Sequence, residues 1–188
     1  MDRSNGDKGE VVPMRKRKWE KLVFTSMFTA LTCIATLVIQ IPSPMNGYLN
    51  LGDALVLLGA WFLGPAYGAF AGGVGSMLAD LLSGYAYYAP GTLVIKALVA
   101  LVAALVFQAL RNKVGEKGPA QIISGILGEC IMVAGYFGYA CLLLQKGLAA
   151  AASIPGNLVQ GVVGIVAATV VYLALRQVAH LPELLRGN

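Results

Sequence analysis

The stretch from Tyr48 to Leu82 decides the fold: YLNLGDALVLLGAWFLGPAYGAFAGGVGSMLADLL. It is apolar almost throughout, and its 35 residues would make a straight helix about 52 Å long. The hydrocarbon core of a bilayer is only about 30 Å thick, so a single helix of that length does not fit across it. Gly64-Pro65 interrupts the stretch near its middle, and such a pair is typical of a turn. We therefore predict two short antiparallel spans, 49–63 and 66–82, joined by a tight turn.

The rest of the chain contains four more apolar runs long enough to cross a membrane. These runs are 22–41, 91–110, 120–144 and 155–175. Pro42 and Pro44 end the first run, and Pro155 suits the first turn of the last helix. With 57% hydrophobic and 12% charged residues, the composition excludes a soluble globular enzyme, a disordered regulator and a disulfide scaffold. The mean hydropathy of +0.72 agrees. We predict an all-α membrane protein, a bundle of six transmembrane helices.

The basic residues orient this bundle. The N-terminal tail through Lys21, the polar loop 111–119 and the C-terminal end from Arg176 onward together hold 12 of the 14 Lys and Arg residues. The opposite side has only Lys146, and Lys96 falls within a span. By the positive-inside rule both termini are cytoplasmic, in a multi-pass protein of the bacterial cytoplasmic membrane. Positive charge placed in this way indicates membrane orientation and not a nucleic-acid partner.

These assignments divide the chain into three parts. A polar basic cytoplasmic tail covers 1–20, the six-helix membrane domain covers 21–178, and a second cytoplasmic tail covers 179–188.

Small residues recur at helical spacing within the predicted spans. Gly64, Gly68 and Gly72 are spaced by four, and closely spaced glycine pairs occur at 125/128 and 161/164. Such stripes let helix backbones approach closely in lipid. Ser26 and Ala30 on the first span are also four apart. Their face is consistent either with packing inside the bundle or with docking of a partner's helix.

Four ionisable side chains fall within the spans, where each needs a partner or a function. Asp53 and Asp80 are expected near the outer surface, Lys96 about 7–8 Å below it, and Glu129 near mid-depth. Asn50 is a plausible helix N-cap, which would put the Asp53 carboxylate at the positive helix end. Lys96 is expected to pair with Asp80 or Glu129, or to extend outward along its own stem. Glu129 must pair, be protonated or face a wet cavity.

Aromatic and amide side chains gather at the same outer end. They are Tyr48, Tyr85, Tyr87, Tyr88, Tyr136, Tyr139, Asn157 and Gln160. An interfacial aromatic belt explains several of the tyrosines without any ligand. It does not explain amides and charges below the surface. Tyrosine walls with a few buried polar groups suit a small, flat, polar ring, so we predict a binding pocket open to the outside.

Motifs for chemistry are missing from the sequence. It has no Walker A, HExxH or GxSxG pattern, a single histidine, His180, and three isolated cysteines, Cys33, Cys130 and Cys141. We therefore predict a protein that is not an enzyme and has no cofactor and no metal site. A binder that takes its energy from partner proteins fits best.

Four segments taken together carry a family resemblance. They read GYLNLGD (47–53), LGP (63–65), GGVGSMLAD (72–80) and YAPGTLVIK (88–96). This pattern resembles the substrate-binding (S) components of energy-coupling factor (ECF) vitamin transporters, and is most similar to the riboflavin-type group. The resemblance covers roughly 22–178.

The resemblance implies a six-helix bundle with both termini inside. It also implies a vitamin or vitamin precursor bound near the outer face, a transmembrane coupling protein and two ATPase subunits as partners. Family members dock through an Ala-x-x-x-Ala face on the first helix, which here reads Ser26-x-x-x-Ala30 and is followed by Ile34. The candidate substrate-binding residues are Asn50, Asp53, Asp80, Tyr85, Tyr88, Thr92, Lys96, Glu129, Tyr136, Tyr139, Asn157 and Gln160.

The predicted pocket is acidic and aromatic, with one lysine, which suits a small nitrogen heterocycle bearing hydroxyl or amino groups. Vitamin B6 forms or the thiamine-precursor pyrimidine come first, and riboflavin next. The alternative is a stand-alone proton-coupled secondary transporter in which Glu129 and Asp80 relay protons.

Overall fold

The computed structural model describes residues 14–43, 47–115 and 118–177. Within these residues the chain forms six α-helices, one two-stranded sheet and two short irregular helices. Their bounds are α1 Met14–Val38, β1 Ile41–Ser43, β2 Gly47–Leu49, α2 Gly52–Leu63, α3 Pro65–Leu82, α4 Ala89–Val114, α5 Pro119–Gly138, the π-helix η1 Tyr139–Leu143, the 3₁₀-helix η2 Gly147–Ser153 and α6 Ile154–Arg176. The predicted all-helical membrane fold is confirmed.

The break at Gly64-Pro65 is also confirmed. Gly64 lies between α2 and α3 with φ +82°, a conformation that favours glycine, and Pro65 opens α3. Gly68 then lets α3 fold back onto α2, because a Cβ at Gly68 would lie 2.8 Å from the Ala60 Cα. The predicted small-residue stripe therefore packs one helix of this hairpin against the other.

Four helical segments are long and apolar enough to cross a membrane: Lys18–Val38, Ala89–Val114, Pro119–Leu143 and Gly147–Arg176. The helix α2 has only 12 residues and is buried along nearly its whole length. A helix that is apolar on all sides belongs inside a bundle. Leucines and valines on the other helices point outward, among them Leu142 at 76% and Val38 at 73% exposure, as expected for side chains that face lipid.

The core is aromatic toward the end of the bundle where α4 and α5 are connected. The ring centroids of Phe62 and Tyr172 are 4.8 Å apart, and Trp61 lies 6.0 Å from Phe107. The Trp61 indole donates a hydrogen bond to the Ser124 hydroxyl at 3.0 Å, so its polar edge is satisfied. This cluster joins α2, α4, α5 and α6 below the polar residues described next.

Two features differ from the sequence prediction. The segment after the first span forms an antiparallel hairpin, in which Pro42 pairs with Tyr48. The first helix begins at Met14, inside the segment predicted as a polar tail. Strands of three residues are too short to give a readable alternation, and a helix continues readily into a charged segment. The remaining tail residues, 1–13 and 178–188, lie outside the described residues.

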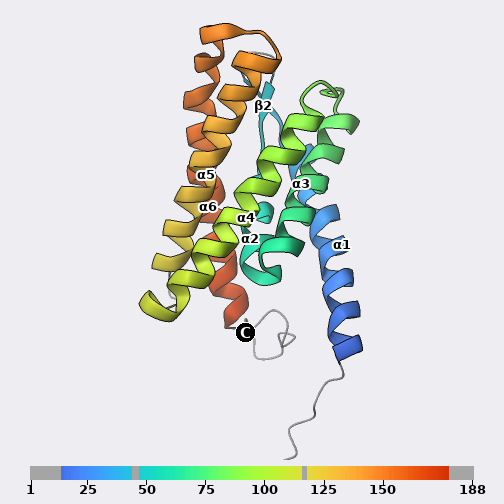
Figure 1. The fold of residues 1–188 in the computed structure, drawn as a ribbon, viewed down its shortest axis with the longest axis vertical. Helices are drawn as coiled ribbons and strands as arrows, with labels where there is room; N and C mark the ends of the chain where they lie inside the picture. The colour runs from blue at the N-terminus through green and yellow to red at the C-terminus, as the bar shows by residue number, and fades with distance from the viewer. Residues whose placement is uncertain (1–13, 44–46, 116–117, 178–188) are drawn as a thin grey trace, which may run out of the picture.

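The two ends of the bundle are distinct in Figure 1. The beginning of α1, the α4–α5 connection and the end of α6 lie at one end, whereas the β-hairpin, the α3–α4 loop and η2 lie at the other. This arrangement agrees with the sidedness predicted from charge, in which the first of these ends faces the cytoplasm.

We therefore expect Lys113→Cys and Leu148→Cys to be labelled from opposite sides of intact cells, in a background without the three native cysteines. Lys113 lies at the end of α4, and Leu148 is 82% exposed at the other end of the molecule. A membrane-impermeant maleimide should modify position 148 but reach position 113 only after permeabilisation. Ready labelling of position 113 from outside would reverse the orientation.

Candidate functional site

A buried ion pair lies at the centre of the site. Lys96 of α4 donates a hydrogen bond from Nζ to Asp53 Oδ1 of α2. Asp53 is 0% and Lys96 2% exposed. The prediction that Lys96 pairs with Asp80 or Glu129 was therefore wrong. The placement of Asp53 near the outer surface was also wrong, because Asp53 packs against Gly164, about 15 Å from the start of α6. The hairpin β1–β2 occupies the chain before α2, so α2 begins inside the bundle and its first turn faces α4.

Gln160 of α6 provides the hydrogen bond to the second oxygen of the Asp53 carboxylate. Its Nε2 donates to Asp53 Oδ2 at 2.5 Å, and its Oε1 accepts from the Asn50 backbone N–H at 2.9 Å. Both Asp53 carboxylate oxygens thus accept a hydrogen bond. The two hydrogen bonds made by the Gln160 amide fix the orientation of its side chain. α6 is tied in this way to the segment between the hairpin and α2.

Asn50 lies one residue before the N-cap of α2, the position that the sequence predicted for it. The N-cap of α2 is Leu51, whose side chain makes no capping hydrogen bond, and the Asn50 Oδ1 accepts instead from the Gly52 N–H at 2.8 Å. This local hydrogen bond, two residues along the chain, is the kind that asparagine makes in turns. Asn50 therefore stabilises the turn that leads into α2, although it is not the N-cap residue of that helix.

Met132 belongs to the same cluster and was missing from the predicted site. Its sulfur lies 3.1 Å from Lys96 Nζ and 3.7 Å from Gln160 Nε2, and the residue is 0% exposed. Its spacing is informative, because 129, 132 and 136 fall on one face of a helix. An apolar residue between two polar ones on that face was a signal that the prediction did not use.

Glu129 lies on the same face of α5 and is 5% exposed. Neither of its carboxylate oxygens has a hydrogen-bond partner among the described residues. Gly161 of α6 leaves space for the Glu129 side chain, because a Cβ at Gly161 would lie 3.0 Å from the Glu129 Cβ. Gly164 does the same for Asp53, at 2.9 Å. The predicted glycine pair on the last helix therefore lets α6 pass close to two acidic side chains.

Above this cluster lies a tyrosine layer. The Tyr136 hydroxyl donates to Thr92 Oγ1 at 3.1 Å, and Lys96 Nζ lies 5.5 Å from the Tyr136 ring centroid. Tyr136, Thr92 and Lys96 thus join the two layers. Cation–π attraction is strongest where the cation is desolvated, as it is here.

Asp80, near the end of α3, accepts a hydrogen bond from a residue of the β-hairpin. The Tyr48 hydroxyl donates to Asp80 Oδ1 at 2.6 Å, and the Tyr48 ring lies 4.8 Å from that of Tyr85. Burial, followed by the hydrogen bond to Asp80, raises the pKa of the Tyr48 phenol far above its usual range, so it stays protonated and remains a donor. The hairpin is thereby fastened to the outer end of α3.

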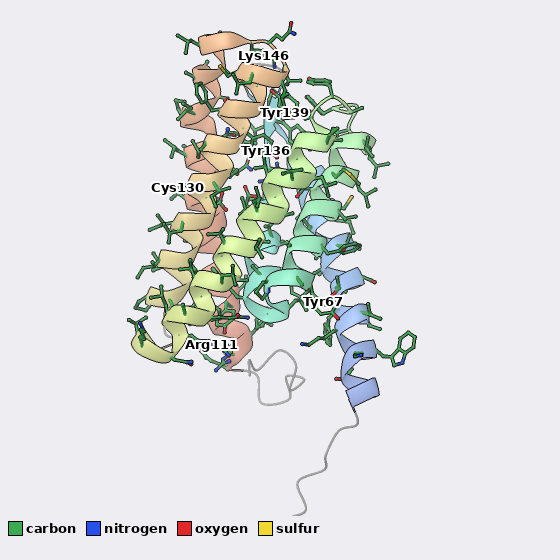
Figure 2. The ribbon with its side chains drawn as sticks, in the orientation of Figure 1. Tyr67, Arg111, Cys130, Tyr136, Tyr139 and Lys146 are labelled. Atoms are coloured by element: carbon green, nitrogen blue, oxygen red, sulfur yellow. The ribbon has the colours of Figure 1, made fainter. Side chains whose placement is uncertain are left out.

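The outermost layer joins the α3–α4 loop to the end of α5. Tyr88 lies 6.3 Å from Tyr136 and 6.0 Å from Tyr139, measured between ring centroids. The Tyr139 hydroxyl donates to the Tyr87 carbonyl at 2.8 Å, and Lys146 Nζ donates to the Tyr88 hydroxyl at 3.2 Å. Figure 2 shows Tyr136, Tyr139 and Lys146 following one another toward this end, with Arg111 and Tyr67 toward the opposite end.

Three predicted residues take no part in these contacts. Asn157 is half-buried one turn before Gln160, and it makes none of the cluster's hydrogen bonds. Ser26 and Ala30 are exposed on α1, whereas Phe28, Thr25 and Thr32 form its buried face. Packing of Ser26 and Ala30 inside the bundle is therefore wrong, and their face is open to lipid or to a partner.

Among the described residues no group of three or more His, Cys, Asp or Glu side chains lies close enough to hold a metal ion. The buried acidic groups are instead arranged around a lysine, an amide and tyrosine hydroxyls, which are the side chains that bind organic ligands by hydrogen bonding and stacking.

Comparisons with known proteins agree with this picture. The family model for the S component of ECF-type riboflavin transporters matches residues 16–177. A protein of Pyrococcus woesei, described as an uncharacterized protein in the gap 3' region, is 38% identical over 135 residues, which cover 71% of this chain and 86% of the relative.

A solved structure of the S component of a bacterial ECF transporter has the same fold, with a TM-score of 0.62 and 24% identity. The match covers 84% of this chain and 96% of that one. Because the family model spans nearly the whole membrane part, and the fold agrees independently, the chain belongs to the family of ECF-type riboflavin transporter S components.

Proposed function

We propose that this chain captures a vitamin or vitamin precursor at the hairpin end of the bundle and passes it on by docking to an ATP-driven coupling module. Membership of the family makes the chain a substrate-binding component of an ECF transporter and a membrane protein. The proposal adds the ligand, its site, the subunits of the module and the cell membrane as the location.

One observation carries the proposal: the polar cluster of Asp53, Lys96, Glu129 and Gln160 buried between α2, α4, α5 and α6. Lipid supplies no hydrogen-bond partners, and ionisable groups held within a membrane bundle mark substrate or ion pathways. Four helices contribute to this cluster, and a tyrosine layer covers it toward the outer end. Such a combination fits a flat polar ligand.

The ligand is proposed to be a nitrogen heterocycle with hydroxyl or amino groups. Riboflavin, which the family description names, is the first compound to test. Vitamin B6 forms and the thiamine-precursor pyrimidine follow, because their smaller rings suit the same tyrosines. A highly anionic ligand suits the site poorly, since Lys96 is already paired with Asp53.

The energy source is proposed to be a transmembrane coupling protein with two ATPase subunits. The sequence carries no nucleotide-binding motif of its own. The exposed face of α1 around Ser26 and Ala30 is the proposed docking surface, because small residues let a second helix approach closely.

Purified chain in liposomes is therefore expected to bind riboflavin without accumulating it. Addition of the coupling protein and both ATPase subunits should produce uptake that requires ATP. Equilibrium dialysis measures binding, and fluorescence of entrapped riboflavin measures uptake, with an inactive ATPase variant as the control. Uphill uptake by the chain alone, driven by a proton gradient, would instead establish the stand-alone transporter with Glu129 and Asp80 as proton carriers.

A further inference from the structure

Glu129 differs from every other charged member of the buried cluster. Both oxygens of Asp53 accept hydrogen bonds, from Lys96 and from Gln160. The Gln160 carbonyl oxygen in turn accepts from the Asn50 N–H. The two Glu129 oxygens have no such partner among the described residues, although the side chain is only 5% exposed.

A buried carboxylate without donors is far more costly than a buried hydroxyl in the same position. The other unpartnered buried oxygens of the described chain are the hydroxyls of Thr32, Ser76 and Thr169 and one oxygen of Asp80. Asp80 accepts a hydrogen bond from Tyr48 through its other oxygen. Among the described residues, Glu129 is therefore the buried side chain in which two adjacent acceptor atoms both lack a hydrogen-bond donor.

The neighbours of Glu129 explain why the protein does not satisfy it. α6 passes at Gly161, which has no side chain, and a Cβ there would lie 3.3 Å from Glu129 Oε2. Lys96 is within electrostatic reach but is bonded to Asp53. Met132, one turn along the same face of α5, offers no donor. No described side chain on these elements supplies a donor to Glu129, whereas a ligand that enters the cluster can supply one.

We propose that Glu129 is the specificity-determining residue of the site and selects ligands that carry two adjacent hydrogen-bond donors. This inference rests on the proposed function. A carboxylate accepts two parallel hydrogen bonds, which adds geometric selection to the charge-assisted strength of each. Two ligand chemistries present such a pair: the edge of a protonated aminopyrimidine, and neighbouring hydroxyls on a polyol chain such as the ribityl group of riboflavin.

Charge balance points to the same class. Lys96 and Asp53 neutralise each other, so an ionised Glu129 leaves the cluster with one negative charge. A cationic ring cancels that charge, and a neutral diol solvates it by hydrogen bonding. A phosphorylated or carboxylated ligand would add a second uncompensated charge beside an ionised Glu129 and should bind more weakly.

The test compares wild type with Glu129→Gln, which keeps the shape and removes the paired acceptor. The probes form two matched pairs. Riboflavin is paired with lumiflavin, which has a methyl group in place of the ribityl chain. The thiamine-precursor aminopyrimidine is paired with its analogue carrying a carbonyl oxygen in place of the amino group. Affinity and melting temperature are measured on the same purified full-length samples.

In wild type, the donor-bearing member of one pair should bind more tightly than its analogue, and that pair identifies the source of the donors. Glu129→Gln should weaken this binding about 10- to 150-fold while the analogue's affinity stays unchanged. Thr169→Val is the matched control, because Thr169 is another buried unpartnered oxygen, about 13 Å further along α6 than Gln160. It should alter neither affinity.

Equal affinity of Glu129→Gln and wild type for a bound probe would overturn this inference and leave the proposed function intact. A lowered melting temperature with unchanged affinity would do the same, by showing that Glu129 serves only packing. Wild type that binds none of the four probes would contradict riboflavin and the thiamine-precursor pyrimidine as ligands, and with them this inference. Should the variant not fold, equal affinity of wild type for both members of each pair would overturn the inference, and a clear preference would support it.

Discussion

Methionine in place of Lys96 is expected to destabilise the protein by about 3–5 kcal/mol, because it leaves the Asp53 carboxylate buried without its cation. Asp53 is 0% exposed, and Gln160 supplies only a neutral donor to its second oxygen. At about 2–4 °C per kcal/mol, the melting temperature in detergent should fall by roughly 6–20 °C. Thermal unfolding followed by tryptophan fluorescence measures the shift, since Trp61 is buried in the same bundle.

Two further variants test whether the lost stability comes from the unpaired Asp53 carboxylate. Combining Lys96→Met with Asp53→Asn removes both charges, so much of the lost stability should return. Lys146→Met is the matched control, because Lys146 is half-buried at the outer rim and contacts the Tyr88 ring and hydroxyl. Its loss should cost about 1 kcal/mol or less. A Lys96→Met protein that melts within two or three degrees of wild type would contradict a buried, mutually dependent ion pair.

Leucine in place of Ala30 is expected to abolish ATP-dependent uptake while leaving ligand affinity unchanged. Ala30 is exposed on α1, away from the buried face that carries Phe28 and Thr32. An added isobutyl group there holds a partner helix away, because close approach depends on small residues. Uptake in liposomes with the complete coupling module, and equilibrium binding to the isolated chain, are measured with the same preparation.

Ala134→Leu provides the control for this substitution, since Ala134 is exposed on α5 and lies outside the proposed docking surface. It should leave uptake and binding near wild type. Loss of binding in Ala30→Leu would mean that α1 shapes the ligand site. Normal uptake would mean that the module docks on another face.

Much of the fold could be predicted because it follows from local chemistry. The glycine and proline at 64–65 break an apolar stretch too long for one span, and the structure places the end of α2 and the beginning of α3 there. Glycine spacing predicted close helix contacts, which Gly68 and Gly164 make. The β-hairpin was missed, because its strands have three residues each and their pairing depends on contacts that the sequence does not display.

The membership of the site was easier to predict than its pairing. Their positions within apolar spans identified Asp53, Asp80, Lys96 and Glu129 as residues that need a partner or a function. Which carboxylate takes the lysine depends on where α2 begins relative to α4, a long-range relation set by the hairpin and by Gly164. Met132 was missed because an apolar residue in a membrane helix does not stand out by composition, and only its position between Glu129 and Tyr136 on one helix face indicates a polar contact.

The most direct test of the account is mass spectrometry of small molecules released from the purified protein. The chain is expressed in cells able to make or take up the candidate vitamins, purified in detergent and denatured. Wild type is expected to release one nitrogen heterocycle in near-stoichiometric amount, and the Asp53→Asn/Lys96→Met double variant, if folded by its melting curve, is expected to release far less. Release of the same compound in the same amount from both proteins would contradict the placement of the ligand at this buried cluster.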